Sequence, residues 1–334
     1  MRRAACATIV LVILAVALGA CGHSAPQAIT VYSGRSEALV GPLIERFESE
    51  TGIDVQVRYG DTAELAALLL EEGANTPADV YFAQDAGALG AVAASGMLEQ
   101  LPAALLERVA DRFRSPAGEW VGTSGRARVV VYDAAALAPA DLPQTIDGFT
   151  QPAWRGRIGW APTNGSFQAF VTAYRLLNGD EAAREWLRGI VANEPRRYES
   201  NAPIVQAVAD GEVDVGFVNH YYLLQAQREQ GLPLVANHFL RGDDAGALIN
   251  VAGAGILTAS EAPDQARRFV EFLLGDESQR YFASETFEYP LVAGIDGPGG
   301  VPPLASLQQP DIDLSDLSDL QGTLRILQEE GVLP

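Results

Sequence analysis

The sequence predicts an α/β protein of two lobes with a mostly parallel sheet. Short apolar or alternating segments, typical of strands, are followed by segments of helical period along most of the chain. This alternation favours parallel strands covered by helices. The 334 residues also exceed what one hydrophobic core usually spans, and no internal repeat or low-complexity tract is present. Two lobes are therefore expected.

Seven segments are predicted to be strands. They are rich in β-branched and aromatic residues and are bounded by Gly, Asn, Asp or Ser, as in ITVYSGR and VDVGFVN. The last of them reads as one bent strand or a pair of strands. The predicted strands are 28–35, 53–59, 78–84, 127–133, 157–161, 213–219 and 247–257.

Ten segments carry apolar residues at the three- and four-residue spacing of helices. The first ends at Gly52, and the second begins with Asp61 and Glu64 in the positions of a capping box. The predicted helices are 36–52, 61–73, 85–96, 166–178, 181–191, 203–211, 223–231, 263–275, 278–287 and 320–331.

The first residues read as an export signal. Residues 1–20 begin with Arg2 and Arg3 and continue with an apolar stretch that is too short for a spanning helix. The sequence LGAC, residues 18–21, is similar to the lipobox of bacterial lipoproteins. This resemblance implies that Cys21 is acylated and that residues 21–27 form a tether. Cleavage without acylation is the alternative. The expected location is the outer face of the cytoplasmic membrane.

The composition excludes several kinds of chemistry. The only cysteines are Cys6, within the signal, and Cys21, so the folded part has no thiol for disulfides, zinc or nucleophilic attack. All 23 basic residues are arginine, which excludes lysine chemistry, and 43 acidic residues give a net charge of −20. Such a surface repels nucleic acid. We expect a monomer that binds no nucleic acid.

The candidate site lies where the predicted strands end. Ligands of open parallel sheets bind beyond the carboxyl ends of the strands. The segments at those ends are YSGR, AQD, YD, APTNGS and NHYY. Most of them carry groups suited to an anion or a hard metal ion.

Tyr221 and Tyr222 are the most distinctive of these residues. On a continuing strand they would face opposite ways, but they can converge where a strand gives way to the helix predicted over 223–231. A phenol has a pKa of about 10 and binds a metal only after losing its proton, which a hard, highly charged ion such as Fe³⁺ favours. The alternative is ordinary packing of two rings at a lobe surface.

Two arginines and a third tyrosine lie near the predicted strand 127–133. Tyr132 ends that strand, where a packed ring with a hydrogen-bonded hydroxyl is the usual role. Arg126 and Arg128 lie at its start, where solvated or ion-paired arginines are common. Arg35, which follows Gly34, is a candidate anion clamp or a surface charge.

An anion site is predicted at the start of the helix near 166. Asn164, Gly165 and Ser166 precede this helix, whose free N–H groups and dipole favour a bound anion. Helix capping alone also explains such residues.

The histidines and acids are weaker candidates. His220 and His238 have no serine or aspartate partner in a triad motif, and His220 should face away if both tyrosines face a ligand. Asp85 and Asp133 also follow predicted strands, where a solvated carboxylate is the plain alternative.

Several motifs, in order, resemble the ferric-ion-binding proteins of bacterial iron ABC transporters. They span about 28–291 and are ITVYSGRSE, ETGIDV, TPADVYFAQD, TSGRARVVVYD, WRGRIGWAPTNGSF, QAVADGEVD, VNHYY, DAGALIN and EYPL. The resemblance implies a hinged, two-lobed fold of the type II periplasmic binding proteins. We expect lobe 1 to comprise 28–125 with 252–301, and lobe 2 to comprise 126–251 with 302–334.

The resemblance also implies a ligand set. Tyr221 and Tyr222 match the tyrosine pair of the family, and Tyr132 matches a third phenolate of some branches. The positions implied to hold a carbonate- or phosphate-like anion are Arg35, Arg126, Asn164, Gly165, Ser166 and Asn201.

Two positions depart from the family pattern. Ser36 stands where some branches have a ligand histidine, and Gln84 stands where they have a ligand glutamate. The resemblance therefore implies a site dominated by tyrosine, completed by a bidentate anion or by water.

The sequence predicts a lipid-anchored receptor that delivers ferric ion to an ABC permease and is not an enzyme. One alternative keeps the fold and binds an anionic small molecule, such as a phosphonate or a sugar phosphate. A second is a secreted enzyme that uses iron for redox chemistry, although no second catalytic constellation is evident.

Overall fold

The computed structural model describes residues 28–232 and 234–334. The predicted signal, the tether and Cys21 lie outside these residues. In the described part of the chain, no helix is both long and apolar enough to cross a membrane.

Ten strands of the described chain form one continuous sheet in the order β2-β1-β3-β9-β4-β7-β5-β6, with β8 and β10 added to β4. Each of the seven predicted strands overlaps an observed one, whereas β6, β8 and β10 were not predicted. The strands are β1 (Ile29–Ser33), β2 (Val55–Tyr59), β3 (Val80–Ala83), β4 (Val121–Asp133), β5 (Ile158–Trp160), β6 (Arg196–Arg197), β7 (Val215–Asn219), β8 (Val235–His238), β9 (Ile249–Ile256) and β10 (Tyr289–Pro290).

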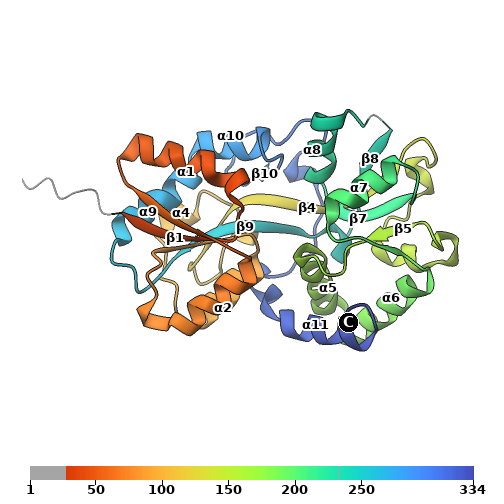
Figure 1. The fold of residues 1–334 in the computed structure, drawn as a ribbon, viewed down its shortest axis with the longest axis horizontal. Coiled ribbons are helices and arrows are strands. Elements are labelled where there is room, and N and C mark those ends of the chain that lie inside the picture. The colour runs from red at the N-terminus through yellow and green to blue at the C-terminus, as the bar shows by residue number, and fades with distance from the viewer. Residues whose placement is uncertain (1–27, 233) are drawn as a thin grey trace, which may run out of the picture.

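The helices cover both faces of this sheet (Figure 1). All ten predicted helices are found, and only the single turn α4 was not predicted. The helices are α1 (Glu37–Thr51), α2 (Thr62–Glu72), α3 (Ala86–Ala94), α4 (Ala103–Leu106), α5 (Gly165–Asn178), α6 (Asp180–Ala192), α7 (Asn201–Ala209), α8 (Tyr221–Gln230), α9 (Pro263–Leu273), α10 (Asp276–Ser284) and α11 (Leu320–Glu329).

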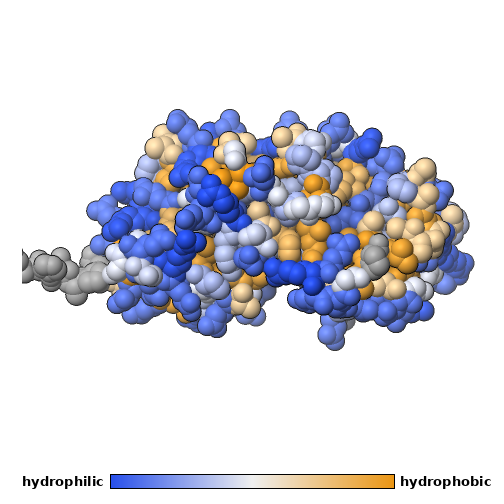
Figure 2. All heavy atoms as spheres, turned by 90° about the horizontal axis from the view of Figure 1, so that it is seen from above, coloured by the Kyte–Doolittle hydropathy of each residue, from blue (hydrophilic) through white to orange (hydrophobic). Residues whose placement is uncertain are grey.

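Strand β4 runs through both halves of the molecule. Its first part pairs with β9 and β10, and its second part pairs with β7 and β8. In Figure 1, the elements from β1 to α4 lie at one end of the molecule, together with α9 and α10. The helices α5 to α8 lie at the other end, together with α11. Figure 2 shows hydrophilic residues over much of this face, with hydrophobic residues at the surface near the middle and also toward the right-hand end.

The prediction of a mostly parallel sheet was wrong, because the sheet is mixed. The pairs β1–β2, β1–β3, β5–β6 and β5–β7 are parallel, but every pairing of β4 and β9 is antiparallel. Strand–helix alternation indicates direction only where a helix returns the chain to the same edge of a sheet. It carries no information about β4 and β9, which pair across the middle of the molecule.

The C-terminal segment contacts both ends of the molecule. A 3₁₀ helix over Leu314–Ser318 packs against α3, and α11 packs against α5 and α6. The hydroxyls of Thr172 and Thr323 are 2.7 Å apart between α5 and α11. The segment therefore bridges helices that lie on either side of β4.

Gly90 allows the C-terminal segment to approach α3 closely. A Cβ added at Gly90 would overlap the backbone of Ser315. We expect Gly90→Ala to lower the free energy of unfolding by about 1–3 kcal/mol, measured by urea denaturation, because the added methyl overpacks this contact. Gly299→Ala is the matched control, since nothing lies within 4 Å of the added Cβ. Equal stability of both variants would contradict this contact.

Candidate functional site

Tyr221 and Tyr222 are the first two residues of α8, directly after His220 and the end of β7. Because strand gives way to helix at this point, both rings turn the same way and stack, with centroids 4.3 Å apart and an interplanar angle of 29°. Tyr221 is buried and Tyr222 is half-buried. Burial, reinforced by the neighbouring Tyr222, raises the pKa of the Tyr221 phenol well above its usual value. The free Tyr221 phenol is therefore neutral at pH 7, and a metal that binds it must displace its proton.

His220 is a core residue beside the tyrosine pair. Its ring Nδ1 accepts a hydrogen bond of 3.1 Å from the Ala127 amide, and the ring stacks on Tyr289 at 4.6 Å. Burial lowers the pKa of His220 to about 4, so the imidazole is neutral at physiological pH. The plane of the ring is perpendicular to that of Tyr221. These contacts hold His220 between β4 and β10.

Arg126 lies at the centre of β4 and is 4% exposed. One terminal nitrogen donates to the carbonyl of Gln84, while the other has no partner among the described residues. Its charge is close enough to Tyr221 to favour the phenolate. Arg126 is therefore positioned to bind an anion near the tyrosine pair.

Arg35 is buried, so the alternative that it is a surface charge was wrong. Its guanidinium donates to the Glu288 carboxylate at 2.7 Å, and both side chains are buried. Although burial alone would raise the pKa of Glu288, the charges of Arg35 and Arg126 bring that pKa below its usual value. Arg35 therefore neutralises a buried carboxylate through one terminal nitrogen, and its assignment as an anion-binding residue stays a prediction.

Asn164, Ser166 and Asn201 come together between the starts of α5 and α7. The Asn164 Oδ1 atom accepts hydrogen bonds from the Ser166 amide at 3.0 Å, the Ser166 hydroxyl at 2.6 Å and the Asn201 amide group at 3.1 Å. Gly165 begins α5 and has open space around it. Free N–H groups and the dipole at the start of a helix favour an anion here.

Arg128 joins this group and was missed as a site residue. Its guanidinium donates to the Phe217 carbonyl at 2.9 Å and to the Ser166 hydroxyl at 3.3 Å. Burial lowers its pKa to about 9, and the neighbouring tyrosines partly oppose that shift. No carboxylate of the described chain lies within ion-pair distance. Arg126 and Arg128 share one face of β4, which the two-residue spacing in SGRAR could have indicated.

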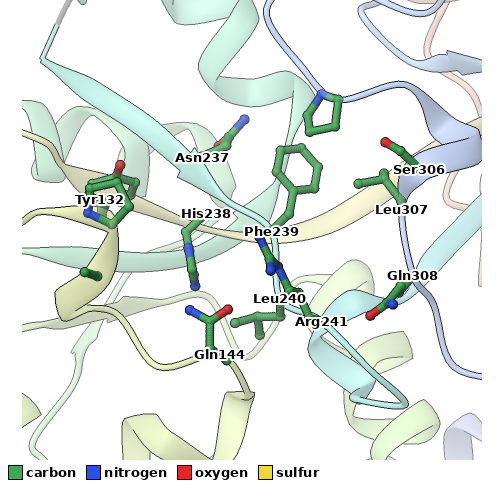
Figure 3. A pocket seen from close by; sticks show the side chains of 13 residues that line it. Tyr132, Gln144, Asn237, His238, Phe239, Leu240, Arg241, Ser306, Leu307 and Gln308 are labelled. Atoms are coloured by element: carbon green, nitrogen blue, oxygen red, sulfur yellow. The ribbon is translucent and has the colours of Figure 1, made fainter.

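The structure does not place Tyr132 beside the tyrosine pair, where it was predicted. Tyr132 lies at the end of β4 that is farther from Tyr221 and Tyr222. In the antiparallel pair of β4 and β7, Arg128 is opposite Asn219 and Tyr132 is opposite Val215. Tyr132 is thus four residues, or about 13 Å, from the strand end that carries the tyrosine pair. Because β4 and β7 are hydrogen-bonded directly to each other, their register keeps Tyr132 away from the pair. Tyr132 instead lines a separate cavity (Figure 3).

The remaining candidate positions are Ser36, Gln84, Asp85 and Asp133. Ser36 is exposed and directly precedes α1. The backbone carbonyl of Gln84 accepts a hydrogen bond from the Arg126 guanidinium. Asp85 caps α3 and accepts from Asn250 at 2.6 Å, and Asp133 accepts from Ala135 at 2.8 Å in a turn. No three His, Cys, Asp or Glu side chains of the described residues are grouped to hold a metal ion.

Comparisons with known proteins agree with this architecture. The sequence pattern of the family described as bacterial extracellular solute-binding protein matches residues 42–298. The major ferric iron-binding protein of Neisseria meningitidis is 35% identical over 308 residues, which cover 91% of this chain and 93% of that protein.

Two solved structures share the fold over nearly their whole lengths. Iron-bound HitA from Pseudomonas aeruginosa is 33% identical with a TM-score of 0.85, covering 92% of this chain and 100% of HitA. The Trichodesmium protein IdiA (FutA), in complex with iron and citrate, is 29% identical with a TM-score of 0.81, covering 91% and 99%. The predicted α/β periplasmic-binding-protein fold and the family resemblance are confirmed. The chain therefore belongs to the bacterial extracellular solute-binding proteins, in the group that includes the ferric iron-binding proteins.

Proposed function

We propose that this protein captures ferric ion through the phenolates of Tyr221 and Tyr222 and delivers it to an ABC importer. The observation that carries the proposal is the stacked pair at the start of α8, with the buried guanidiniums of Arg126 and Arg128 nearby. The names of the similar proteins support ferric ion as the cargo. Ferric ion is hard and highly charged, so it favours anionic oxygen ligands and displaces phenol protons.

A companion anion completes the proposed ferric site. Two phenolates leave one positive charge on Fe³⁺, and the nearby Arg126 and Arg128 add two more. Asn164, Gly165, Ser166 and Asn201 supply donors for a carbonate- or phosphate-like anion. Such an anion would occupy the coordination positions for which this chain offers neither histidine nor glutamate.

The two lobes are proposed to close on the metal. Lobe 1 would consist of 28–125 with 252–301, and lobe 2 of 126–251 with 302–334. A ligand that binds the closed form more tightly shifts the population toward it, and the permease would recognise that form. The 3₁₀ helix over Leu314–Ser318, packed on α3, would follow lobe 1 rather than the rest of its segment.

Dialysis against ferric citrate, followed by metal analysis, tests the cargo. The iron-free chain is expected to retain one iron, which is not removed by dialysis against buffer. Failure to retain iron, together with calorimetric binding of a sugar phosphate or phosphonate, would instead support the alternative cargo. That alternative is favoured by the buried Arg128 beside the Ser166 hydroxyl, which suits a phosphate group without any metal.

Arg128 is expected to make iron binding depend on the anion. Loss of a hydrogen bond to a charged group weakens binding about 10- to 100-fold. Arg128→Gln should therefore bind iron about 10- to 100-fold more weakly in phosphate or bicarbonate, and should lose most of the dependence on either anion. Iron titrations at several anion concentrations measure both effects. Arg196→Gln is the control, because Arg196 is exposed and paired with Glu212. An unchanged anion dependence in Arg128→Gln would exclude Arg128 from the site.

A lipid anchor at Cys21 is proposed to keep the receptor at the outer face of the cytoplasmic membrane. The amide-linked and diacylglycerol chains of a lipoprotein together satisfy the two-signal requirement for stable attachment. Cys21→Ser is expected to move the protein from the membrane fraction to the soluble fraction without changing iron binding. If the wild-type protein is already soluble and not acylated, as judged by fractionation and mass spectrometry, the anchor is excluded. The protein is proposed to act as a monomer and not as an enzyme.

A further inference from the structure

A cavity of about 760 Å³ lies apart from the tyrosine pair. Its walls come from the loop before β5, from β8 with the three residues that follow it, and from the C-terminal segment. Figure 3 shows Tyr132 and Gln308 at opposite sides of this cavity, with His238 and Phe239 between them. None of the proposed iron or anion ligands lines it. Its volume is within the range of about 300–1,000 Å³ typical of small-molecule sites.

The charges around the cavity favour an anion. The chain has 43 acidic and 23 basic residues, yet the lining includes Arg241 and no aspartate or glutamate. Within the described residues, no carboxylate lies at ion-pair distance from Arg241. Burial, together with the charge of Arg241, lowers the pKa of His238, so this ring is neutral at pH 7 and Arg241 supplies the positive charge. A guanidinium binds carboxylates and phosphates in bidentate fashion, and the apolar side chains of Phe239, Leu240 and Leu307 beside it favour a carboxylate on a hydrocarbon ring.

The rest of the lining suits a planar, apolar ring. Phe239 and Tyr132 contribute aromatic rings, and Leu240 and Leu307 add aliphatic surface.

Two contacts connect this cavity to the residue before the tyrosine pair. The side-chain amide of Asn237 donates to the His220 carbonyl at 2.9 Å. The Tyr289 hydroxyl donates to the carbonyl of Pro302 at 2.9 Å, and its ring stacks on His220. The cavity is therefore close to the iron site but does not open onto its ligands, so the two sites must be distinguished by mutation.

We propose that this cavity binds a small aromatic carboxylate, with the carboxylate on Arg241 and the ring against Phe239 and Leu307. The site is additional to the proposed iron site and does not depend on it.

Calorimetric titration of the iron-free chain with 4-hydroxybenzoate tests the proposal. The para hydroxyl cannot chelate iron together with the carboxylate, so the probe reports on the cavity. We expect one saturable site, weakened about tenfold in Arg241→Gln through loss of the charged hydrogen bonds. Neutral 4-hydroxybenzamide should bind about tenfold more weakly than the acid for the same reason. Arg268→Gln should bind like wild type, because Arg268 is an exposed residue on α9, away from the cavity.

Two results would overturn the proposal. One is the absence of saturable binding at millimolar 4-hydroxybenzoate in wild type. The other is binding that survives Arg241→Gln but is lost in Tyr221→Phe, which would place the probe at the tyrosine pair. Iron retention by the same preparations is measured separately, so failure here is distinguishable from failure of the proposed iron site. Arg241 is exposed, and unchanged urea denaturation of Arg241→Gln would verify that the variant is folded.

Discussion

Replacement of Tyr221 or Tyr222 by phenylalanine is expected to weaken ferric-ion binding by at least about 100-fold. Loss of a residue that only supports a metal ligand typically costs about 10–100-fold in affinity, and loss of a ligand costs more. Phenylalanine retains the ring, so the stacking at 4.3 Å and the start of α8 should survive. Competition with citrate for iron measures the affinity of each variant.

Tyr132→Phe is the matched control for the tyrosine pair. Tyr132 is a buried tyrosine of the same half of the molecule, but it lies at the opposite end of β7 from the pair. Its substitution should leave iron affinity within about twofold of wild type, well inside the scatter of a remote mutation. A loss as large as that of Tyr221→Phe would return Tyr132 to the site and contradict our placement of the metal.

Glu288→Gln is expected to lower the free energy of unfolding of the iron-free protein by about 3–5 kcal/mol. The carboxylate binds Arg35 at 2.7 Å and accepts from the Ser124 hydroxyl at 2.8 Å, with both charged side chains almost fully buried. A glutamine keeps the shape but leaves the Arg35 charge without a counter-ion, which a low-dielectric interior penalises strongly. Urea denaturation followed by circular dichroism measures the loss.

Two further variants test whether the loss of stability in Glu288→Gln comes from an unpaired buried charge. Glu212→Gln removes an exposed partner of Arg196, with side chains 50% and 56% exposed, and should cost less than about 1 kcal/mol. The double variant Arg35→Met with Glu288→Leu removes both buried charges and should recover much of the stability lost in Glu288→Gln. A loss below about 1 kcal/mol in Glu288→Gln would mean that water reaches the pair and that Arg35 is free for another partner.

The secondary structure could be predicted because it depends on local patterns. Asp61 accepts from the Ala63 and Glu64 amides at the start of α2, as the predicted cap requires. Gly52 adopts the left-handed conformation that ends α1. The direction of β4 and β9 depends instead on pairing between residues more than a hundred positions apart, such as Arg126 with Asn250. No local period records that pairing.

The same distinction explains which candidate residues came together. Two groups of candidates are neighbours in sequence just after a strand, namely Tyr221 with Tyr222 and Asn164 with Ser166. The rule that ligands bind beyond strand ends was therefore sufficient to find them. Tyr132 also ends a strand, but β4 runs antiparallel to β7, so its end lies at the opposite edge of the sheet. Arg35 contacts Glu288, which lies 253 positions later in the sequence, and no sequence pattern near Arg35 predicts that contact.

The visible absorption spectrum of the purified, iron-free protein, titrated with ferric citrate, tests the central claim most directly. Iron held by tyrosine phenolates produces a reddish charge-transfer band. We expect this band to saturate at one iron per chain, to be lost in Tyr221→Phe and in Tyr222→Phe, and to be unchanged in Tyr132→Phe. A protein that remains colourless and takes up no iron would contradict ferric capture by this pair.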